Sequence, residues 1–418
     1  MNAEEARNYQ DAGLEELPPD QRAGAGYHKR RANFELLRVL AMLMVVALHY
    51  LSHGNLLPVR GEALTAATVT GTVAEALCIA AVNVWILISG YFLSDTGVSL
   101  KKLLRVVAEI YFYTILITLV MELTGQGSVL AGGAYGVVEY LFPISGKHYW
   151  FATAYVFMYL FSPLLNKGVL VLTRKQLKVA ILGLLIWFCF IKSLVPVYFA
   201  TDDYGYGFGW FMTLYLIAAY IRRYKAGPHT AGHQEKERIP FLNTPRGCVL
   251  LWLGSVAGII LVRLVIHAIN LKTGHLASWQ GTPFDYNYIL TLTAALGLFG
   301  AFRFLRIREG LMAEVLRVMG PLTFGVYLLH EHLLIRDQWI DWVQDFIGEI
   351  PRENPLFLVI HMITSVIIVF LAGIMIDFIR VNVFRWLARV LGNTKPVLAL
   401  KKLDKATHKD NGRYEKVV

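Results

Sequence analysis

The stretch FELLRVLAMLMVVALHYLSHGN, Phe34 to Asn55, decides the fold, because it is a long apolar run that carries two titratable side chains. A run of about 18 apolar residues is long enough to cross a bilayer as an α-helix. Arg38 and His49 are eleven residues apart, which is roughly three helical turns or ~16.5 Å along the axis and nearly one face. A charge at bilayer depth costs on the order of 2.5–3.5 kcal/mol, so it persists where it has a partner or a task.

Apolar runs of this kind recur through the chain. Of its 418 residues, 56% are hydrophobic, and the mean hydropathy is +0.49. The apolar residues come in runs rather than in alternating or amphipathic patterns. The sequence therefore predicts an all-α, polytopic membrane protein of about ten transmembrane helices. The ten predicted spans are 34–51, 66–93, 103–124, 148–166, 179–196, 207–221, 248–270, 286–302, 320–336 and 355–378.

The distribution of basic residues predicts the orientation of these spans. If the N-terminus is cytoplasmic, 32 of the 40 Lys and Arg residues fall in cytoplasmic segments. Only Arg60, Lys147, Lys272 and Arg352 fall in outer loops. This asymmetry follows the positive-inside rule, so we expect both termini in the cytoplasm. The net charge of +10 is then explained by the lipid bilayer, and we expect no nucleic-acid partner.

Composition also divides the chain into segments. Residues 1–31 are polar, with four early glutamates and no secretory signal, and predict a cytoplasmic tail. Residues 32–389 hold the predicted spans and form one membrane domain. Within it, the Gly/Pro-rich stretch 224–247 predicts a cytoplasmic linker. Residues 390–418 predict a short, basic cytoplasmic tail.

The first span offers a cation near one membrane surface and a proton acceptor near the other. With the N-terminus inside, Arg38 lies about one turn from the cytoplasm, and His49 lies in the outer half. An alternative stays open, in which Arg38 extends its head to the cytoplasmic interface and His49 caps the outer end of the helix. No metal site is expected, because His330 and His332 are two positions apart, which is not a metal-ligand spacing. The three cysteines are far apart in sequence and predict buried small hydrophobes rather than disulfides.

Further polar groups lie at the ends of other predicted spans. Near the cytoplasmic end of the second span, Ser89 and Gly90 are small enough to let helices approach closely. Lys102 and Arg105 follow on the same side of the membrane. Together with Arg38, they predict a cationic cytoplasmic face.

Two outer segments add aromatic and ionisable side chains. Tyr149 and Trp150 begin the fourth span, where an aromatic belt at the interface is the alternative interpretation. The ninth span reads GPLTFGVYLLHEHLLIR and places Tyr327, His330 and Glu331 well inside the membrane. A histidine and a carboxylate in one turn at that depth indicate function rather than packing.

At these residues the chain resembles the acyltransferase-3 family of bacterial integral-membrane O-acyltransferases. Its most specific motif, Arg-x10-His, is matched by Arg38 and His49. A second motif, FF-x-x-SG, is matched by WILISGYFL with Trp85 in place of the first Phe. A cytoplasmic Arg-x-x-Arg is present as Lys102 and Arg105. The resemblance covers about residues 31–385.

Two more motifs lie in the later spans. The W…E…Y…P pattern is matched by Trp150, Tyr159 and Pro163. Tyr155 stands where the family often has Glu, which puts a carboxylate role there in doubt. The pattern S-x-Y-x-x-H is matched by Tyr327 and His330. The stretch YWFATAYVFMYLFSPLLNK is similar to the branch that modifies exopolysaccharides and the cell envelope.

The resemblance implies acyl transfer from a cytoplasmic acyl-CoA, acetyl-CoA in our expectation, to a hydroxyl of an envelope glycan or lipid-linked saccharide at the bacterial plasma membrane. No permanently bound cofactor is expected. Cations at Arg38, Lys102 and Arg105 suit the phosphates of coenzyme A. The imidazole of His49 can take a hydroxyl proton near neutral pH, so His49 is the expected general base, and an acyl-His intermediate stays open.

The other candidate residues surround this pair. His330, with Glu331 nearby, is expected to orient the acceptor or to stabilise charge on the carbonyl oxygen. Residues expected to bind the acceptor or to support the site are Ser89, Tyr149, Trp150, Tyr327 and Glu331. Whether a separate extracytoplasmic protein completes the transfer stays open.

Three rival functions remain. A transporter or flippase of a glycan or small anionic substrate also uses intramembrane His and Arg, but it favours inverted repeats, and no matching halves are visible. A non-catalytic membrane scaffold is the second rival. The third is the other class of membrane-bound O-acyltransferases, whose His/Asn signature differs from the Arg-x10-His pattern.

Overall fold

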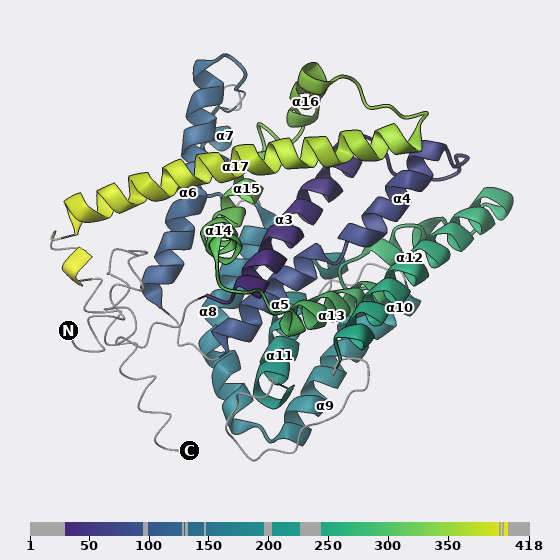
Figure 1. Cartoon of the computed structure of the whole chain (residues 1–418), viewed down its shortest axis with the longest axis horizontal. Helices are drawn as coiled ribbons and strands as arrows, with labels where there is room; N and C mark the ends of the chain where they lie inside the picture. Colours follow the sequence, from purple (N-terminus) through teal and green to yellow (C-terminus); the bar gives the residue numbers. More distant parts are fainter. Residues whose placement is uncertain are drawn as a thin grey trace.

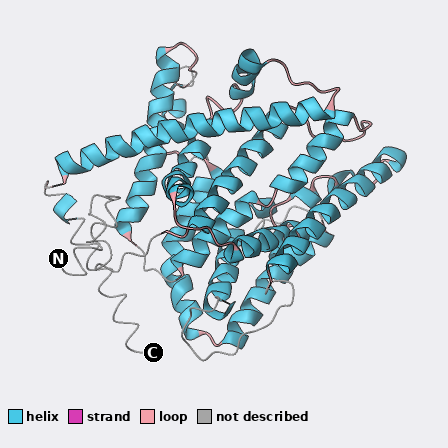
Figure 2. Ribbon diagram, viewed as in Figure 1, coloured by secondary structure: helices cyan, strands magenta, loops and turns pink. Residues whose placement is uncertain are grey.

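The structure is a computed structural model that describes residues 30–94, 99–127, 129, 133–145, 148–195, 203–225, 244–392, 394 and 397–399. Within these ranges the chain is helical and contains no strand (Figure 2). The predicted polar tail up to residue 29, the linker 226–243 and the basic tail from residue 400 lie outside the described residues. The prediction of an all-α fold is confirmed.

Nine helical segments in the described ranges are long and apolar enough to cross a membrane. Some of them join more than one helical element, such as α4 (Ala66–Cys78) with α5 (Ala81–Leu93), and α9 (Arg174–Leu185) with a π-helical turn and α10 (Lys192–Leu194). The chain is therefore a multi-pass membrane protein. The nine segments are Ala32–His53, Ala66–Leu93, Leu100–Leu123, Trp150–Val171, Arg174–Leu194, Pro245–Thr273, Ala277–Phe304, Leu311–His330 and Pro355–Leu391.

The sixth predicted span, 207–221, is not among these nine segments and corresponds to helix α11 (Phe208–Lys225). Its 18 residues end in Arg222, Arg223 and Lys225, so it is less apolar than the nine others. Helix α11 nevertheless packs against α5 and α8 (Trp150–Val171). Gly90 permits the contact with α5, because a Cβ there would lie 2.9 Å from the Cα of Tyr215. The predicted role of Gly90 in close helix approach is confirmed.

Helix α3 (Ala32–His53), which carries Arg38 and His49, lies at the centre of the bundle (Figure 1). It contacts α4, α5, α13 (Ile289–Phe304), α14 (Leu311–Met319), α15 (Thr323–His330) and α17 (Pro355–Leu391). A helix so surrounded turns its polar side chains toward other helices rather than toward lipid. The remaining helices are α6 (Leu100–Leu123), α7 (Gly133–Leu141), α12 (Pro245–Thr273) and α16 (Trp339–Ile347).

Local sequence signals set several helix ends. Thr244 accepts a hydrogen bond from the backbone of Gly247, and Pro245 occupies the first turn of α12, where its missing N–H costs nothing. The same helix ends at Gly274, whose φ of 72° is left-handed. Asn354 caps α17 in the same manner, with Pro355 following.

The boundaries predicted for the ninth span are wrong. The structure begins this segment at Leu311 and ends it at His330, so Glu331 and His332 lie in the turn after the helix rather than within it. A 3-10 turn at Gly320–Leu322 separates α14 from α15. Pro321 has no backbone N–H to continue an α-helix across this point. Because α15 is short, its C-terminal end meets the C-terminal part of α3.

The last span is longer than predicted. Helix α17 has 37 residues, or ~55 Å at 1.5 Å per residue, whereas the hydrocarbon layer is about 30 Å thick. Figure 1 shows α17 crossing α3 and α15. Through this crossing, α17 supports the two helices that carry the candidate histidines.

Candidate functional site

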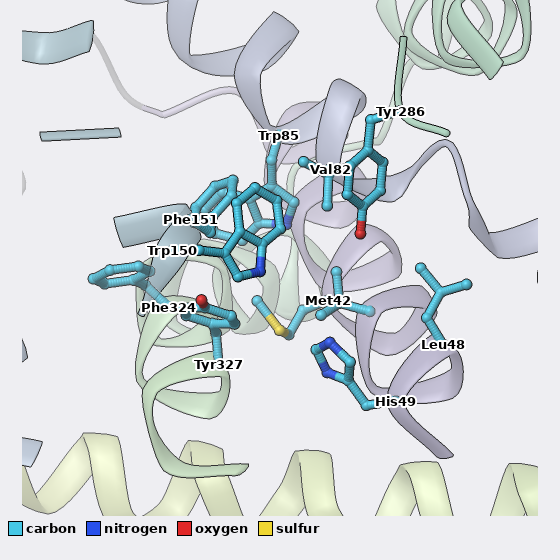
Figure 3. A pocket seen from close by; sticks show the side chains of 11 residues that line it. Met42, Leu48, His49, Val82, Trp85, Trp150, Phe151, Tyr286, Phe324 and Tyr327 are labelled. Atoms are coloured by element: carbon cyan, nitrogen blue, oxygen red, sulfur yellow. The ribbon is translucent and has the colours of Figure 1, made fainter. Parts of the chain in front are cut away.

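A pocket lies beside the C-terminal half of α3 (Figure 3). Side chains from α3, α5, α8 and α15 and from the segment before α13 line it. Six of the lining side chains are aromatic, and His49 is the only ionisable group among them apart from the two tyrosines. The lining residues are Met42, Val45, Leu48, His49, Val82, Trp85, Trp150, Phe151, Tyr286, Phe324 and Tyr327.

Hydrogen bonds fix the proton positions on His49 and His330. Nδ1 of His330 lies 2.6 Å from the carbonyl oxygen of Val326, which can only accept, so this nitrogen carries the proton. Nε2 of neutral His330 then accepts from Nδ1 of His49 at 2.8 Å. His49 is left with an unprotonated Nε2, which no hydrogen bond engages among the described residues. That nitrogen is free to act as a base in the pocket.

A carboxylate supports the same tautomer of His49. Oε1 of Glu331 lies 3.2 Å from Nδ1 of His49 and 3.7 Å from Nε2 of His53. Burial works to raise the pKa of the Glu331 carboxyl, but the neighbouring His49 and His53 outweigh it and lower the pKa to about 2. Glu331 is therefore anionic at neutral pH. We call His49, His53, His330 and Glu331 the histidine cluster.

Three members of the histidine cluster, His49, His330 and Glu331, have ligand atoms within 4.8 Å of one another. However, the two nitrogens that face each other are only 2.8 Å apart. Two nitrogens on a tetrahedral zinc at 2.0–2.1 Å would be about 3.3 Å apart. The spacing is that of a shared proton, so the donor set fits a hydrogen-bonded network better than a metal site. The absence of a metal stays a prediction.

The opposite wall of the pocket is a stack of aromatic rings. The rings of Trp150 and Tyr286 are 5.6 Å apart and nearly parallel, and Tyr206 packs on both. In Figure 3 the hydroxyl of Tyr286 points toward His49. The hydroxyl of Tyr327 is buried and has no hydrogen-bond partner of good geometry among the described residues. The pocket thus offers flat apolar faces, one base and two hydroxyl groups.

Tyr149 lies behind this wall rather than in the pocket. Its hydroxyl donates to the carbonyl of Leu328 at 2.9 Å, which fastens α15 to the start of α8. His148 and His332 lie beyond it, with ring centroids 4.6 Å apart. Burial lowers the pKa of His148 to about 3 and that of His332 to about 4, so both are neutral at physiological pH. The sequence analysis placed Tyr149 and Trp150 together at the site, but only Trp150 lines the pocket.

Near the N-terminal end of α3, Arg38 pairs with Glu35, one turn earlier on the same helix. The distance between Nη1 and Oε1 is 2.5 Å, and the Arg38 side chain is 18% exposed. Tyr155 faces Ser89, with Arg38 nearby. Arg38 does not line the pocket, whose nearest residue on the same helix is Met42. The structure brings Arg38, Ser89 and Tyr155 together and His49 together with His330, Glu331, Trp150 and Tyr327.

Lys102 and Arg105 are exposed near the N-terminal end of α6. Tyr159 holds this end, because its hydroxyl accepts from the backbone N–H of Ser99 and donates to the carbonyl of the same residue, both at 3.1 Å. Ser99 in turn caps the helix by accepting from the backbone of Lys102. Neither basic residue lines the pocket around His49.

Several functional candidates escaped the sequence analysis. Glu35 had a usable signal, since a carboxylate three residues before an arginine is a helical pairing distance. Tyr286 had none, because it lies in the segment before α13 and reaches the pocket only through folding. His53 is four residues after His49 on the same helix face, and its partner Glu331 is far away in the sequence.

A second buried ionic group lies between α6 and α17. Arg380 binds both carboxylate oxygens of Asp377, at 2.6 and 2.9 Å, and pairs with Glu109 at 3.1 Å. Tyr113 donates to Asp377 at 2.9 Å. We call these four residues the acid–arginine cluster. A Cβ on Gly325 of α15 would lie 2.2 Å from Asp377, so the cluster packs directly against the helix that carries His330.

No curated protein and no solved structure matches the chain. A family model described as an acyltransferase domain matches residues 31–374. This match covers most of the chain, from just before α3 into α17, and includes every residue that lines the pocket. An acyltransferase of this family moves acyl groups other than aminoacyl groups. The chain belongs to the acyltransferase-3 family and is a membrane acyltransferase.

Proposed function

We propose that this protein moves an acyl group, acetyl in our expectation, from a cytoplasmic acyl-CoA to a hydroxyl of an envelope or exopolysaccharide glycan at the bacterial plasma membrane. The observation that carries the proposal is the position of His49. Its Nδ1 is held by His330 and Glu331, whereas its Nε2 is unprotonated beside an aromatic pocket. A histidine oriented by a carboxylate, with its other nitrogen free, suits a general base.

Each part of the transfer step can then be assigned to a side chain of the pocket. His49 takes the proton of the acceptor hydroxyl, and the oxygen attacks the thioester carbonyl carbon. Negative charge develops on the carbonyl oxygen, where a hydroxyl donor stabilises it. The hydroxyl of Tyr327 is the donor that we assign, because it lies in the pocket wall and has no hydrogen-bond partner of good geometry among the described residues. The carbon–sulfur bond breaks, and coenzyme A leaves.

The aromatic wall supports a saccharide acceptor. The faces of a sugar ring carry C–H groups with partial positive charge, and aromatic faces are negative. Trp150 and Tyr286 form a stacked platform opposite His49. A sugar ring on this platform would present a hydroxyl at its edge to the imidazole. A lipid-linked saccharide could approach in the same way from the bilayer.

The donor would bind on the other side of the membrane. Arg38, Lys102 and Arg105 are cations at or near the cytoplasmic ends of α3 and α6, and guanidinium groups suit phosphate recognition. About three helical turns separate Arg38 from His49, a span of ~16.5 Å that a thin pantetheine arm can cover. Because Met42 ends the pocket on the Arg38 side, donor binding must move side chains around it.

The test is a transfer assay with purified protein in lipid vesicles, acetyl-CoA labelled on the acetyl group, and an envelope glycan. We expect label to move to the glycan as an alkali-sensitive ester. His49→Ala should reduce this transfer by about 10²–10⁴-fold while donor binding persists. The matched control is His275→Ala, since His275 has an exposed side chain outside the pocket.

The alternative function is a membrane transporter or flippase, which the intramembrane histidines also fit. Movement of the glycan across the vesicle membrane without transfer of label, and unaffected by His49→Ala, would support the alternative and overturn the proposed function.

A further inference from the structure

A row of ionisable groups leads away from the pocket toward the outer surface. Nδ1 of His49 lies 3.2 Å from Oε1 of Glu331, the same oxygen lies 3.7 Å from Nε2 of His53, and Nδ1 of His53 lies 3.5 Å from Oδ1 of Asp337. The side-chain exposure is 21% for His49, 12% for Glu331, 22% for His53 and 70% for Asp337. The row thus joins the base beside the pocket to open solvent at Asp337, through the less exposed Glu331.

The fold makes this row from two helix ends. His53 is the last residue of α3 and lies one turn after His49, so both side chains leave the same face. Glu331 follows directly after α15, and Asp337 precedes α16. Trp339 of α16 packs against both His53 and His330, with ring centroids 6.5 and 6.3 Å away, and covers the row from one side.

The other charged groups nearby make no ion pair with Glu331 or His53 among the described residues. Arg336 lies 3.7 Å from Asp337. Arg352 donates to the backbone carbonyls of Gly54 and Asn55, and His361 contacts the hydroxyl of Tyr50. None of them makes an ion pair with Glu331 among the described residues. The ionisable groups that face Glu331 are the histidines of the histidine cluster, His49, His53 and His330.

We propose that Glu331 and His53 form a proton relay that carries the acceptor's proton from His49 to the outer face at Asp337. The inference rests on the proposed function and on the orientation that the basic residues predict. It assigns roles to His53 and Asp337, neither of which touches the pocket. Both histidine nitrogens of His53 face a carboxylate, so the ring can accept a proton at one nitrogen and release one from the other.

The proton balance of this route is closed. The acceptor O–H bond breaks and its proton joins Nε2 of His49, while the oxygen bonds to the acyl carbon and the thiolate leaves on the cytoplasmic side. There the thiolate takes a proton from water. The imidazolium of His49 gives its Nδ1 proton to Glu331, which passes it through His53 to Asp337 and the outer water. The ring regains its Nδ1–H form by exchange with water after product release. For each ester formed, one proton is released at the outer face and one proton is taken up by the thiolate on the cytoplasmic side.

The simpler route returns the proton from Nε2 of His49 to the thiolate and moves no proton across the membrane. The two routes differ in an observable. The wild-type protein is placed in sealed vesicles with its outer face toward the lumen. The lumen holds the glycan and a pH-sensitive dye, and acetyl-CoA is added outside at pH 7. The relay predicts acidification of the lumen by about one proton per ester formed, since the coenzyme A thiol is protonated at pH 7. Ester formation without lumen acidification would overturn the relay and leave the proposed function intact.

A variant provides the second test. We expect His53→Ala to lower kcat by at least about tenfold with little change in KM for the donor, because the proton transfer slows and binding does not. Imidazole added on the glycan side should restore kcat in proportion to its concentration, which a purely structural role of His53 would not allow. His275→Ala is again the control. Unchanged kcat in His53→Ala, or a loss that imidazole does not restore, would overturn the relay. A protein with no acyl transfer at all would instead refute the proposed function.

Discussion

The histidine cluster and the acid–arginine cluster are both buried within the helix bundle, yet their groups are used differently. In the acid–arginine cluster, Arg380 is bidentate to Asp377 and also pairs with Glu109. In the histidine cluster, Nε2 of His49 has no hydrogen bond among the described residues, and neither has the hydroxyl of Tyr327 in the adjoining pocket wall by geometric criteria. The comparison shows that an ionisable group within a membrane protein indicates a catalytic role when one of its hydrogen-bonding atoms has no partner in the fold. Where that capacity is filled, the group holds the fold together.

The largest effect is expected from breaking the acid–arginine cluster. Arg380→Met removes the cation and leaves Asp377 and Glu109 as two buried carboxylates. Removing one partner of a buried ion pair costs about 3–5 kcal/mol. We expect a large fall in the thermal unfolding midpoint of the solubilised protein, with turnover lost only in proportion to the unfolded fraction.

The control for this variant is Arg385→Met, on the same helix and outside the cluster. Normal unfolding of Arg380→Met combined with lost turnover would contradict the comparison, because it would assign the acid–arginine cluster to the chemistry.

The second effect concerns the histidine cluster. Glu331→Gln removes the charge that stabilises a protonated imidazole at His49, and a hydrogen bond to a charged group contributes about 1.5–3 kcal/mol. We expect kcat to fall by about ten- to a hundredfold. Because the pKa of Glu331 is lowered to about 2, its carboxylate stays ionised from pH 5 to 9. The loss of kcat/KM of the wild-type enzyme toward acidic pH, its acid limb, is therefore not caused by protonation of Glu331.

The sign of the pH shift follows from the lost charge. Without the carboxylate, the imidazolium form is less favoured, so more acid is needed to protonate the base. The acid limb of kcat/KM should therefore move to lower pH in Glu331→Gln, measured from pH 5 to 9. Asp345→Asn, an exposed change outside the cluster, should leave the limb in place. A limb that moves to higher pH would show that Glu331 does not act on the catalytic base.

The third effect tests whether the two clusters are coupled through α15. Gly325→Ala would place a methyl group 2.2 Å from Asp377 and 2.6 Å from the hydroxyl of Tyr113. Overpacking of this kind costs about 1–3 kcal/mol. We expect lower stability and, because α15 carries His330, a lower kcat in the protein that remains folded. Gly254→Ala, where a Cβ would meet nothing within 4 Å, should change neither. Lost stability with normal kcat would show that the clusters are independent.

Local sequence signals carried the prediction of the fold. Apolar runs predicted the helical segments, and α11 was recognised although its cationic end makes it less apolar than the rest. The C-terminal boundary predicted for the ninth span was wrong, because apolar residues continue in the sequence after His330. The Gly320–Pro321 pair was a local signal for the break before α15, whereas the end of the helix at His330 is set by contacts with α3 and α16.

The site was predictable only in part. His49 and His330 could be named from motif positions, but their contact joins residues 281 apart in the sequence, which no local pattern encodes. Glu331 was predicted to bind the acceptor or to support the site, but not as a partner of His49. Its contact with His49 arises because the helix ends before it and the turn brings its carboxylate back to α3. Tyr286 and the acid–arginine cluster depend entirely on how distant helices pack.

The smallest effect is expected from removal of a single oxygen atom, and two neighbouring tyrosines, Tyr327 and Tyr149, provide a matched pair. Tyr327→Phe removes a buried hydroxyl that has no partner of good geometry among the described residues. Stability should therefore be unchanged or slightly higher, while kcat falls by about two- to tenfold, because a hydrogen bond to the developing oxyanion is lost. Tyr149→Phe removes a hydroxyl that donates to the carbonyl of Leu328. It should lower stability by about 1 kcal/mol with little change in kcat. Thermal unfolding and initial rates of both variants, measured side by side, check the pair. The reverse pattern would mean that Tyr149 supports the reaction and that Tyr327 only packs.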